Sequence, residues 1–202
     1  DTTNQFLHAV EGTGEFIFRS ERSGWGHLYL TDGTNTQPIT RGPWVVRGVE
    51  FVDEAARQIV FRASGKEANE DPYFVKYYRV GFDGKGLRCL TPDYGQHNVQ
   101  LSPDRKVLID SVSTAVRAPI HTLRSAVDGK ALIELEKADT SSLLAGGWKP
   151  PQPFVAKGRD GKTDIFGLVF RPRTMDPTKR YPVIEDIYAG PHDSFVPKAF
   201  SA

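Results

Sequence analysis

A unit of four short predicted strands occurs three times in the first two thirds of the chain. The second strands of the units carry the matching apolar runs Phe16–Arg19, Ile59–Arg62 and Val107–Asp110. One strand precedes each run and two follow it, and no segment here keeps a helical periodicity. Four strands that repeat at a period of roughly forty residues are typical of β-propeller blades. A β-sandwich with coincidental spacing is the alternative.

The remaining predicted strands have short apolar cores. They are Phe6–Val10, His27–Leu30, Pro38–Ile39, Val49–Val52, Tyr77–Val80, Leu87–Leu90, Val99–Leu101, Ile120–Leu123 and Ala131–Leu135. Asp-Gly turns recur at Asp32-Gly33, Asp83-Gly84 and Asp128-Gly129, between apolar runs, and Asp-Gly is a strong hairpin signal. Known propellers have roughly 4–8 blades, so about three blades predict an incomplete propeller.

The character of the sequence changes after Glu136. Residues Ser141–Ala145 are expected to form one helical turn, and Gly146–Pro151 reads as a linker. Two strands, Phe154–Lys157 and Asp164–Phe170, flank the turn Asp160-Gly161 and predict a hairpin.

The segment from Tyr181 to His192 contains a short apolar run. Val183, Ile184 and Ile187 predict a brief buried strand that ends at Tyr188, because Gly190 and Pro191 cannot continue a ladder. In open α/β sheets, function gathers beyond the carboxyl ends of the strands. The acidic residues at 185 and 186 depart from the apolar pattern of a strand that is covered on both faces.

The composition is that of an ordinary globular protein. The formal net charge of +1 over 202 residues predicts neither nucleic acid nor an anionic membrane as a partner. A single cysteine, Cys89, excludes an intrachain disulfide. The sequence contains no apolar run of transmembrane length and no secretory signal pattern, so an exported, periplasmic or cytoplasmic location stays open.

Three stretches carry a resemblance to a known family. Residues 20–29 (SERSGWGHLY), 39–44 (ITRGPW) and 179–191 (KRYPVIEDIYAGP) resemble the dipeptidyl peptidase IV branch of the prolyl oligopeptidase family. The similarity follows the same order over nearly the whole chain. It implies an eight-bladed propeller followed by an α/β-hydrolase domain. The expected domains are a partial propeller over 1–138, a linker with a short helical turn over 139–153, and the first strands of the hydrolase sheet over 154–202.

The family is one of serine peptidases that release N-terminal dipeptides with proline or alanine second. The chemistry needs a Gly-x-Ser-x-Gly elbow, then Asp, then His. The sequence contains no such elbow and no match to the acidic pair that binds the free amine, so we expect this chain alone to be inactive. The resemblance implies peptide substrates, no metal or other cofactor, and a homodimeric full-length protein. The alternatives are an acylaminoacyl peptidase or oligopeptidase, and a non-catalytic propeller that binds proteins.

Two residues are the site candidates that the resemblance implies. Tyr188 matches the tyrosine whose hydroxyl helps to form the oxyanion hole, and His192 is expected to line the substrate cavity. The other histidines (His8, His27, His97 and His121) have no metal-ligand spacing, and we expect strand packing for His27 and His121, which lie at similar places in two blades. Cys89 is expected to be an inert, buried thiol, and Gly81–Gly86 is expected to be a hairpin turn rather than a phosphate loop.

The uncovered faces of an incomplete propeller lead to a prediction about self-association. Three blades leave sheet faces uncovered at both ends, and such apolar faces and edges favour self-association. We therefore expect the isolated chain to associate with itself through its blade faces.

Overall fold

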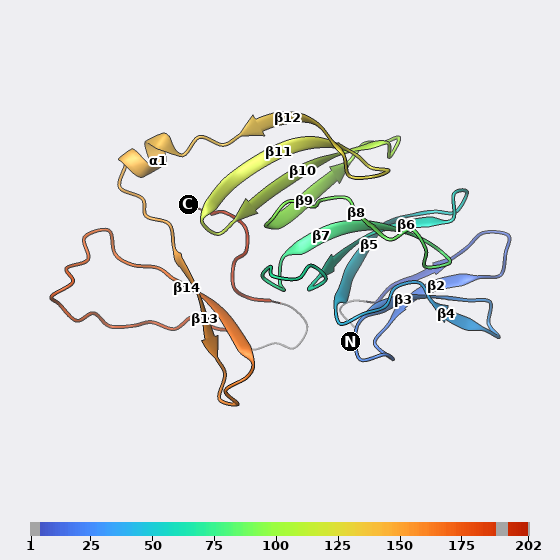
Figure 1. Cartoon of the computed structure of the whole chain (residues 1–202), viewed down its shortest axis with the longest axis horizontal. Coiled ribbons are helices and arrows are strands. Elements are labelled where there is room, and N and C mark those ends of the chain that lie inside the picture. The colour runs from blue at the N-terminus through green and yellow to red at the C-terminus, as the bar shows by residue number, and fades with distance from the viewer. Residues whose placement is uncertain (1–4, 189–193, 202) are drawn as a thin grey trace.

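Three four-stranded antiparallel sheets follow one another along the chain in the computed structural model, which describes residues 5–188 and 194–201 (Figure 1). In each sheet the strands neighbour one another in sequence order. The first sheet contains β1 (Leu7–Ala9), β2 (Phe16–Ser20), β3 (His27–Thr31) and β4 (Thr36–Pro38). The second contains β5 (Val45–Asp53), β6 (Gln58–Ser64), β7 (Val75–Gly81) and β8 (Arg88–Cys89). The third contains β9 (Gln96–Leu101), β10 (Val107–Thr114), β11 (Arg117–Ser125) and β12 (Ala131–Lys137).

The three Asp-Gly turns connect the third and fourth strands of the three sheets. Gly33, Gly84 and Gly129 have φ values of 87°, 75° and 75°, in the left-handed region that glycine enters without steric cost. The preceding aspartates accept backbone N–H groups from two or three residues later. The repeated blade turn is therefore confirmed, and so is the interpretation of Gly81–Gly86 as a turn.

The second sheet is buried on both faces. Ile59 and Phe61 of β6 belong to a core shared with the first sheet, whereas Val60 between them belongs to a core shared with the third sheet. Successive side chains of a strand point to opposite faces, so a strand between two cores needs apolar residues at every position. This requirement explains the unbroken apolar run at the start of β6.

Aromatic residues fill the core between the first two sheets. Trp44 stacks with Phe61 and Tyr78, at ring-centroid distances of 6.2 and 6.4 Å, and meets the His27 ring edge-on at 4.7 Å. Polar contacts also join these sheets, since the Arg57 guanidinium donates to both carboxylate oxygens of Glu15. These aromatic side chains thus pack between the first two sheets.

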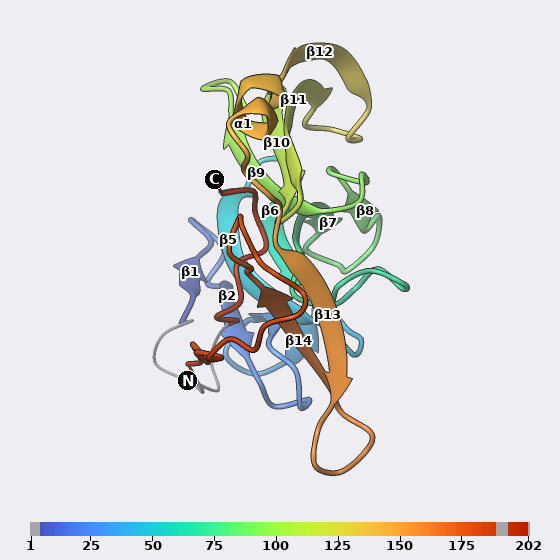
Figure 2. The ribbon, with the colours of Figure 1, turned by 90° about the vertical axis from the view of Figure 1, so that its left-hand side faces the viewer.

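The chain beyond the third sheet is more exposed. Helix α1 (Ser141–Ala145) is the expected helical turn, and β13 (Gln152–Lys157) pairs with β14 (Asp164–Val169) in the expected hairpin. Figure 2 shows the turn of this hairpin projecting beyond the sheets. No helix in the described part of the chain is long and apolar enough to cross a membrane.

The prediction of a buried strand before Tyr188 is wrong for this structure. Residues 181–188 form no strand, and Val183 and Ile184 are 93% and 90% exposed. A strand needs a neighbour to satisfy its backbone groups, and β13 and β14 pair only with each other among the described residues. Pro182 also lacks the N–H that a ladder would use.

Candidate functional site

Tyr188 lies at the end of the irregular segment 181–188. Its side chain is 71% exposed, and its ring contacts that of Phe195 at 6.0 Å between centroids. Within the described ranges, its hydroxyl group makes no hydrogen bond. The following turn and His192 lie outside the described residues.

A short C-terminal segment, residues 194–201, lies against the ends of the second and third sheets (Figure 1). The Lys198 ammonium donates to the Asp71 carboxylate at 2.6 Å, and both side chains are largely buried. The same ammonium lies 5.1 Å from the Tyr73 ring centroid and 5.2 Å from that of Phe166 in β14. This combined ion pair and cation–π contact joins the hairpin, the segment and the second sheet.

Two further contacts hold the segment in place. The Phe200 N–H donates to Ser113 Oγ at 3.2 Å, near the end of β10. The Phe200 ring also meets Trp148 at 5.4 Å between centroids. Asp71 lies on the loop between β6 and β7, and Ser113 lies just before the turn between β10 and β11. Residues 194–201 therefore lie at the same end of both sheets, where β6 and β10 end.

The histidines of the sheets make local structural contacts. His97 is 2% exposed, and its two ring nitrogens face the Asp110 carboxylate and the Asp93 carbonyl, each at 2.7 Å. Arg124 donates to the other Asp110 oxygen at 2.9 Å. Asp110 is fully buried, so this cluster braces the interior of the third sheet.

His27 is similarly enclosed. Its ring nitrogens bond to Thr40 Oγ1 and to the Gly42 carbonyl, each at 2.9 Å. Burial lowers the pKa of His27 below its ordinary value, and the nearby Arg19 charge lowers it further. His8 and His121 pair with Glu54 and Ser111. In the described part of the chain, no three His, Cys, Asp or Glu residues are grouped to hold a metal ion.

Cys89 has the properties expected of an inert thiol. It is half-buried in β8, next to the core shared by the first two sheets. Burial raises the pKa of its thiol, which disfavours the nucleophilic thiolate.

The contacts of Lys198 with Asp71 and Tyr73 were not predicted from the sequence. The partners are 127 residues apart for the ion pair, and no local pattern marks either of them. These contacts are tertiary, because they depend on where β14 and residues 194–201 lie relative to the second sheet.

Comparison with protein families explains the repeated sheets. The family model for the dipeptidyl peptidase IV (DPP IV) N-terminal region matches residues 2–119, which is more than half of the chain. The chain belongs to this family. The DPP IV N-terminal region thus accounts for the first two sheets and much of the third.

Curated relatives extend the likeness to the C-terminal part. A probable dipeptidyl-aminopeptidase B of Penicillium rubens is 30% identical over 186 residues, covering 88% of this chain and 20% of that protein. Dipeptidyl peptidase 4 of Arthroderma otae is 25% identical over 203 residues, covering 98% of this chain and 26% of that protein. Mouse dipeptidyl peptidase 8 is 26% identical over 235 residues, covering 99% of this chain and 26% of that protein. The chain thus spans between a fifth and about a quarter of these DPP IV-like relatives.

Solved structures share the fold. The crystal structure of Porphyromonas gingivalis dipeptidyl peptidase 4 matches with a TM-score of 0.74 at 23% identity, covering 97% of this chain and 27% of that one. A putative dipeptidyl aminopeptidase IV from Bacteroides ovatus matches with a TM-score of 0.72 at the same identity. Together with the observed sheets, these matches confirm the mainly β fold of four-stranded blades.

Proposed function

We propose that this chain is part of a serine-type dipeptidyl peptidase that releases N-terminal dipeptides with proline or alanine second. One observation carries the proposal. The curated relatives named as dipeptidyl peptidases or dipeptidyl-aminopeptidases match between 88% and 99% of the chain, far beyond a single motif. The blades would restrict access to the active site, and the acyl transfer would occur on residues outside this sequence.

Tyr188 is the residue we assign to catalysis in the full-length protein. When a serine attacks the scissile carbonyl, negative charge develops on the carbonyl oxygen, and a preorganised donor about 3 Å away lowers the barrier. The Tyr188 side chain is exposed, and its hydroxyl group is the donor that we propose for the substrate carbonyl oxygen. His192 is proposed to line the same cavity.

The Lys198 contacts support this assignment. They tie residues 194–201, whose Phe195 ring contacts Tyr188, to the loop that carries Asp71 at one end of the sheets. A fixed donor is worth more than a mobile one, because no reorganisation is needed as charge develops. We therefore treat Lys198 and Asp71 as positioning residues for Tyr188.

The test is steady-state kinetics of the full-length protein on a Gly-Pro chromogenic substrate. Tyr188→Phe removes one hydroxyl, and kcat should fall by about 10²–10³ with little change in KM, as for other lost oxyanion donors. Tyr181→Phe is the matched control, since that hydroxyl accepts the Asp176 N–H at 2.9 Å and should have no catalytic role. The isolated chain, which has no Gly-x-Ser-x-Gly elbow, should not turn over this substrate.

Other outcomes assign other functions. An unchanged kcat in Tyr188→Phe contradicts the oxyanion role. Hydrolysis of N-acylated peptides alone favours the acylaminoacyl peptidase alternative. A full-length protein without any hydrolase activity favours the protein-binding propeller.

A further inference from the structure

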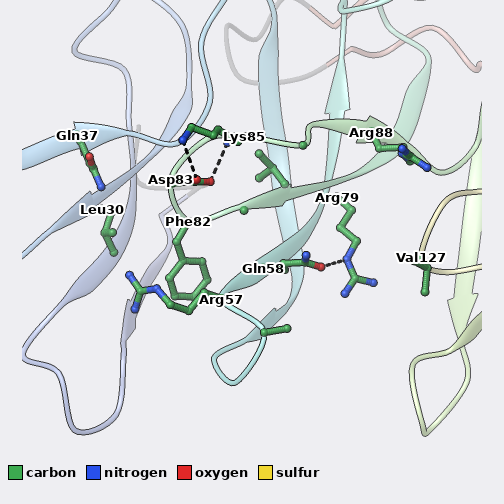
Figure 3. Close-up of a pocket in the computed structure, with 14 residues that line it drawn as sticks. Leu30, Gln37, Arg57, Gln58, Arg79, Phe82, Asp83, Lys85, Arg88 and Val127 are labelled. Atoms are coloured by element: carbon green, nitrogen blue, oxygen red, sulfur yellow. Dashed lines mark hydrogen bonds and ion pairs between the residues drawn. The ribbon is translucent and has the colours of Figure 1, made fainter.

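An open cavity of about 640 Å³ lies at one end of the second sheet (Figure 3). The turns between β5 and β6 and between β7 and β8, together with the strand ends next to them, form most of its wall. Residues of the first and third sheets complete it. The cavity lies at the Gln58 end of β6, whereas the loop that carries Asp71 follows the other end. It is therefore at the opposite end of the sheet from residues 194–201.

The lining of the cavity is basic. Four cationic side chains (Arg57, Arg79, Lys85 and Arg88) face one carboxylate, that of Asp83. Two of the cations already have partners, since Arg57 pairs with Glu15 and Lys85 lies 3.7 Å from Asp83. The remaining positive charge of the lining belongs to Arg79 and Arg88.

Arg79 and Arg88 are directly opposite each other in the pairing of β7 with β8. Opposed residues of an antiparallel pair share one face of the sheet, and like charges at such positions destabilise it. Arg79 is held by neutral acceptors, the Gln58 side chain and the Ala126 carbonyl. No carboxylate within the described ranges forms an ion pair with either arginine at salt-bridge distance.

The Asp128 carboxylate on the neighbouring blade compensates part of the Arg88 charge. Their interaction is electrostatic, and the Asp128 carboxylate accepts hydrogen bonds from Ser125 and from the Lys130 N–H. In the part of the chain that the structure describes, the Arg88 guanidinium makes no hydrogen bond. Two guanidinium groups thus share one face of an open cavity with unused donors.

We propose that this basic cavity binds a doubly charged oxyanion of the phosphate type between Arg79 and Arg88. Planar guanidinium groups match the oxygens of phosphate and form charge-assisted, bidentate hydrogen bonds to it. A dianion also offsets the repulsion between the two arginines, which a monovalent carboxylate would offset only in part. Gln58 fixes the Arg79 side chain on one side of the site (Figure 3).

The experiment is a titration of the full-length protein with inorganic phosphate at constant ionic strength, followed by ³¹P NMR. Arg88→Gln should weaken phosphate binding at least tenfold. The matched control is Lys106→Gln, which removes one charge from an exposed side chain on the turn between β9 and β10, outside the cavity. Equal weakening in both variants, or no binding of millimolar phosphate to the unsubstituted protein, overturns the proposal.

Thermal unfolding gives a second readout that a merely structural role would not reproduce. Without phosphate, Arg88→Gln should unfold at the same temperature as the unsubstituted protein or higher, because like-charge repulsion is relieved. With phosphate, the unsubstituted protein should gain stability by mass action and the variant should not. Sulfate should compete and acetate should not. Acetate that competes as strongly as sulfate contradicts the assignment to a dianion.

Discussion

The second blade and the segment before Tyr188 contain similar apolar runs with opposite fates. Ile59, Val60 and Phe61 are at most 1% exposed, because the first and third sheets cover the two faces of their strand. Val183 and Ile184 are almost fully exposed, and no described strand pairs with them. An apolar run therefore specifies that a segment can be buried, while neighbouring sheets decide whether it is.

The largest effect that we expect from this contrast is association of the isolated chain. We propose that it self-associates through uncovered apolar surface, including Leu132 and Ile133 on the edge strand β12. Light scattering should show a mass that rises with concentration. Ile133→Lys should reduce the rise more than Leu144→Lys, which places the same charge on α1. A concentration-independent monomer would contradict this prediction.

Truncation of matched phenylalanines measures the contrast within one molecule. Phe61→Ala should lower the free energy of unfolding by about 3–5 kcal/mol, because it leaves a cavity between the first two sheets. Phe170→Ala, at a side chain that is 69% exposed, should change it by less than about 0.5 kcal/mol. Urea unfolding at one fixed protein concentration compares them. Equal costs would show that residues beyond β14 are packed as tightly as the second blade.

Ion pairs sharpen the same comparison. Asp110→Asn should lower the free energy of unfolding by about 3 kcal/mol, since the buried Arg124 guanidinium then keeps only the half-exposed Asp93 carboxylate as an ionic partner. In the hairpin, Asp164 pairs with Lys157, and both side chains are about half exposed. Asp164→Asn removes this pair and should lower the free energy of unfolding by less than about 1 kcal/mol. The measurement is again urea unfolding. A large cost for the hairpin pair would refute the view that the hairpin is held weakly.

The pH dependence of stability offers the smallest effect. The folded-state pKa of His27 lies below its ordinary value of 6.5, so folding favours the neutral ring. Its contribution is fully present above about pH 6.5 and is lost as the pH falls toward the lower folded pKa, because the unfolded chain binds a proton first. The difference in unfolding free energy between His27→Asn and the unsubstituted chain should therefore shrink below pH 6.5. A difference that stays constant with pH would contradict this.

Strands with strong local patterns were predicted well from the sequence. Strand β2 (Phe16–Ser20) contains the whole predicted run Phe16–Arg19, and the hairpin of β13 and β14 was expected. Strand β5 (Val45–Asp53) is longer than the predicted Val49–Val52. The prediction was too short because register shifts near Gly48 and Glu50 break the alternation of apolar and polar residues that marks a strand.

Contacts between distant segments could not be predicted. The ion pair between Lys198 and Asp71 depends on the path of the chain after the third sheet, and single-sequence patterns report only local structure. The cross-strand pair of Arg79 and Arg88 likewise requires the register of β8, whose two residues give no periodicity. The site candidate Tyr188 came from family resemblance rather than from its local pattern.

Product analysis of the full-length protein tests the proposed function most directly. A peptide with proline second would be offered with a free amino terminus and with an acetylated one, and the products would be identified by mass spectrometry. The proposal predicts release of the intact N-terminal dipeptide from the free peptide alone. Release of an acylated amino acid, or no cleavage of either peptide, would contradict it.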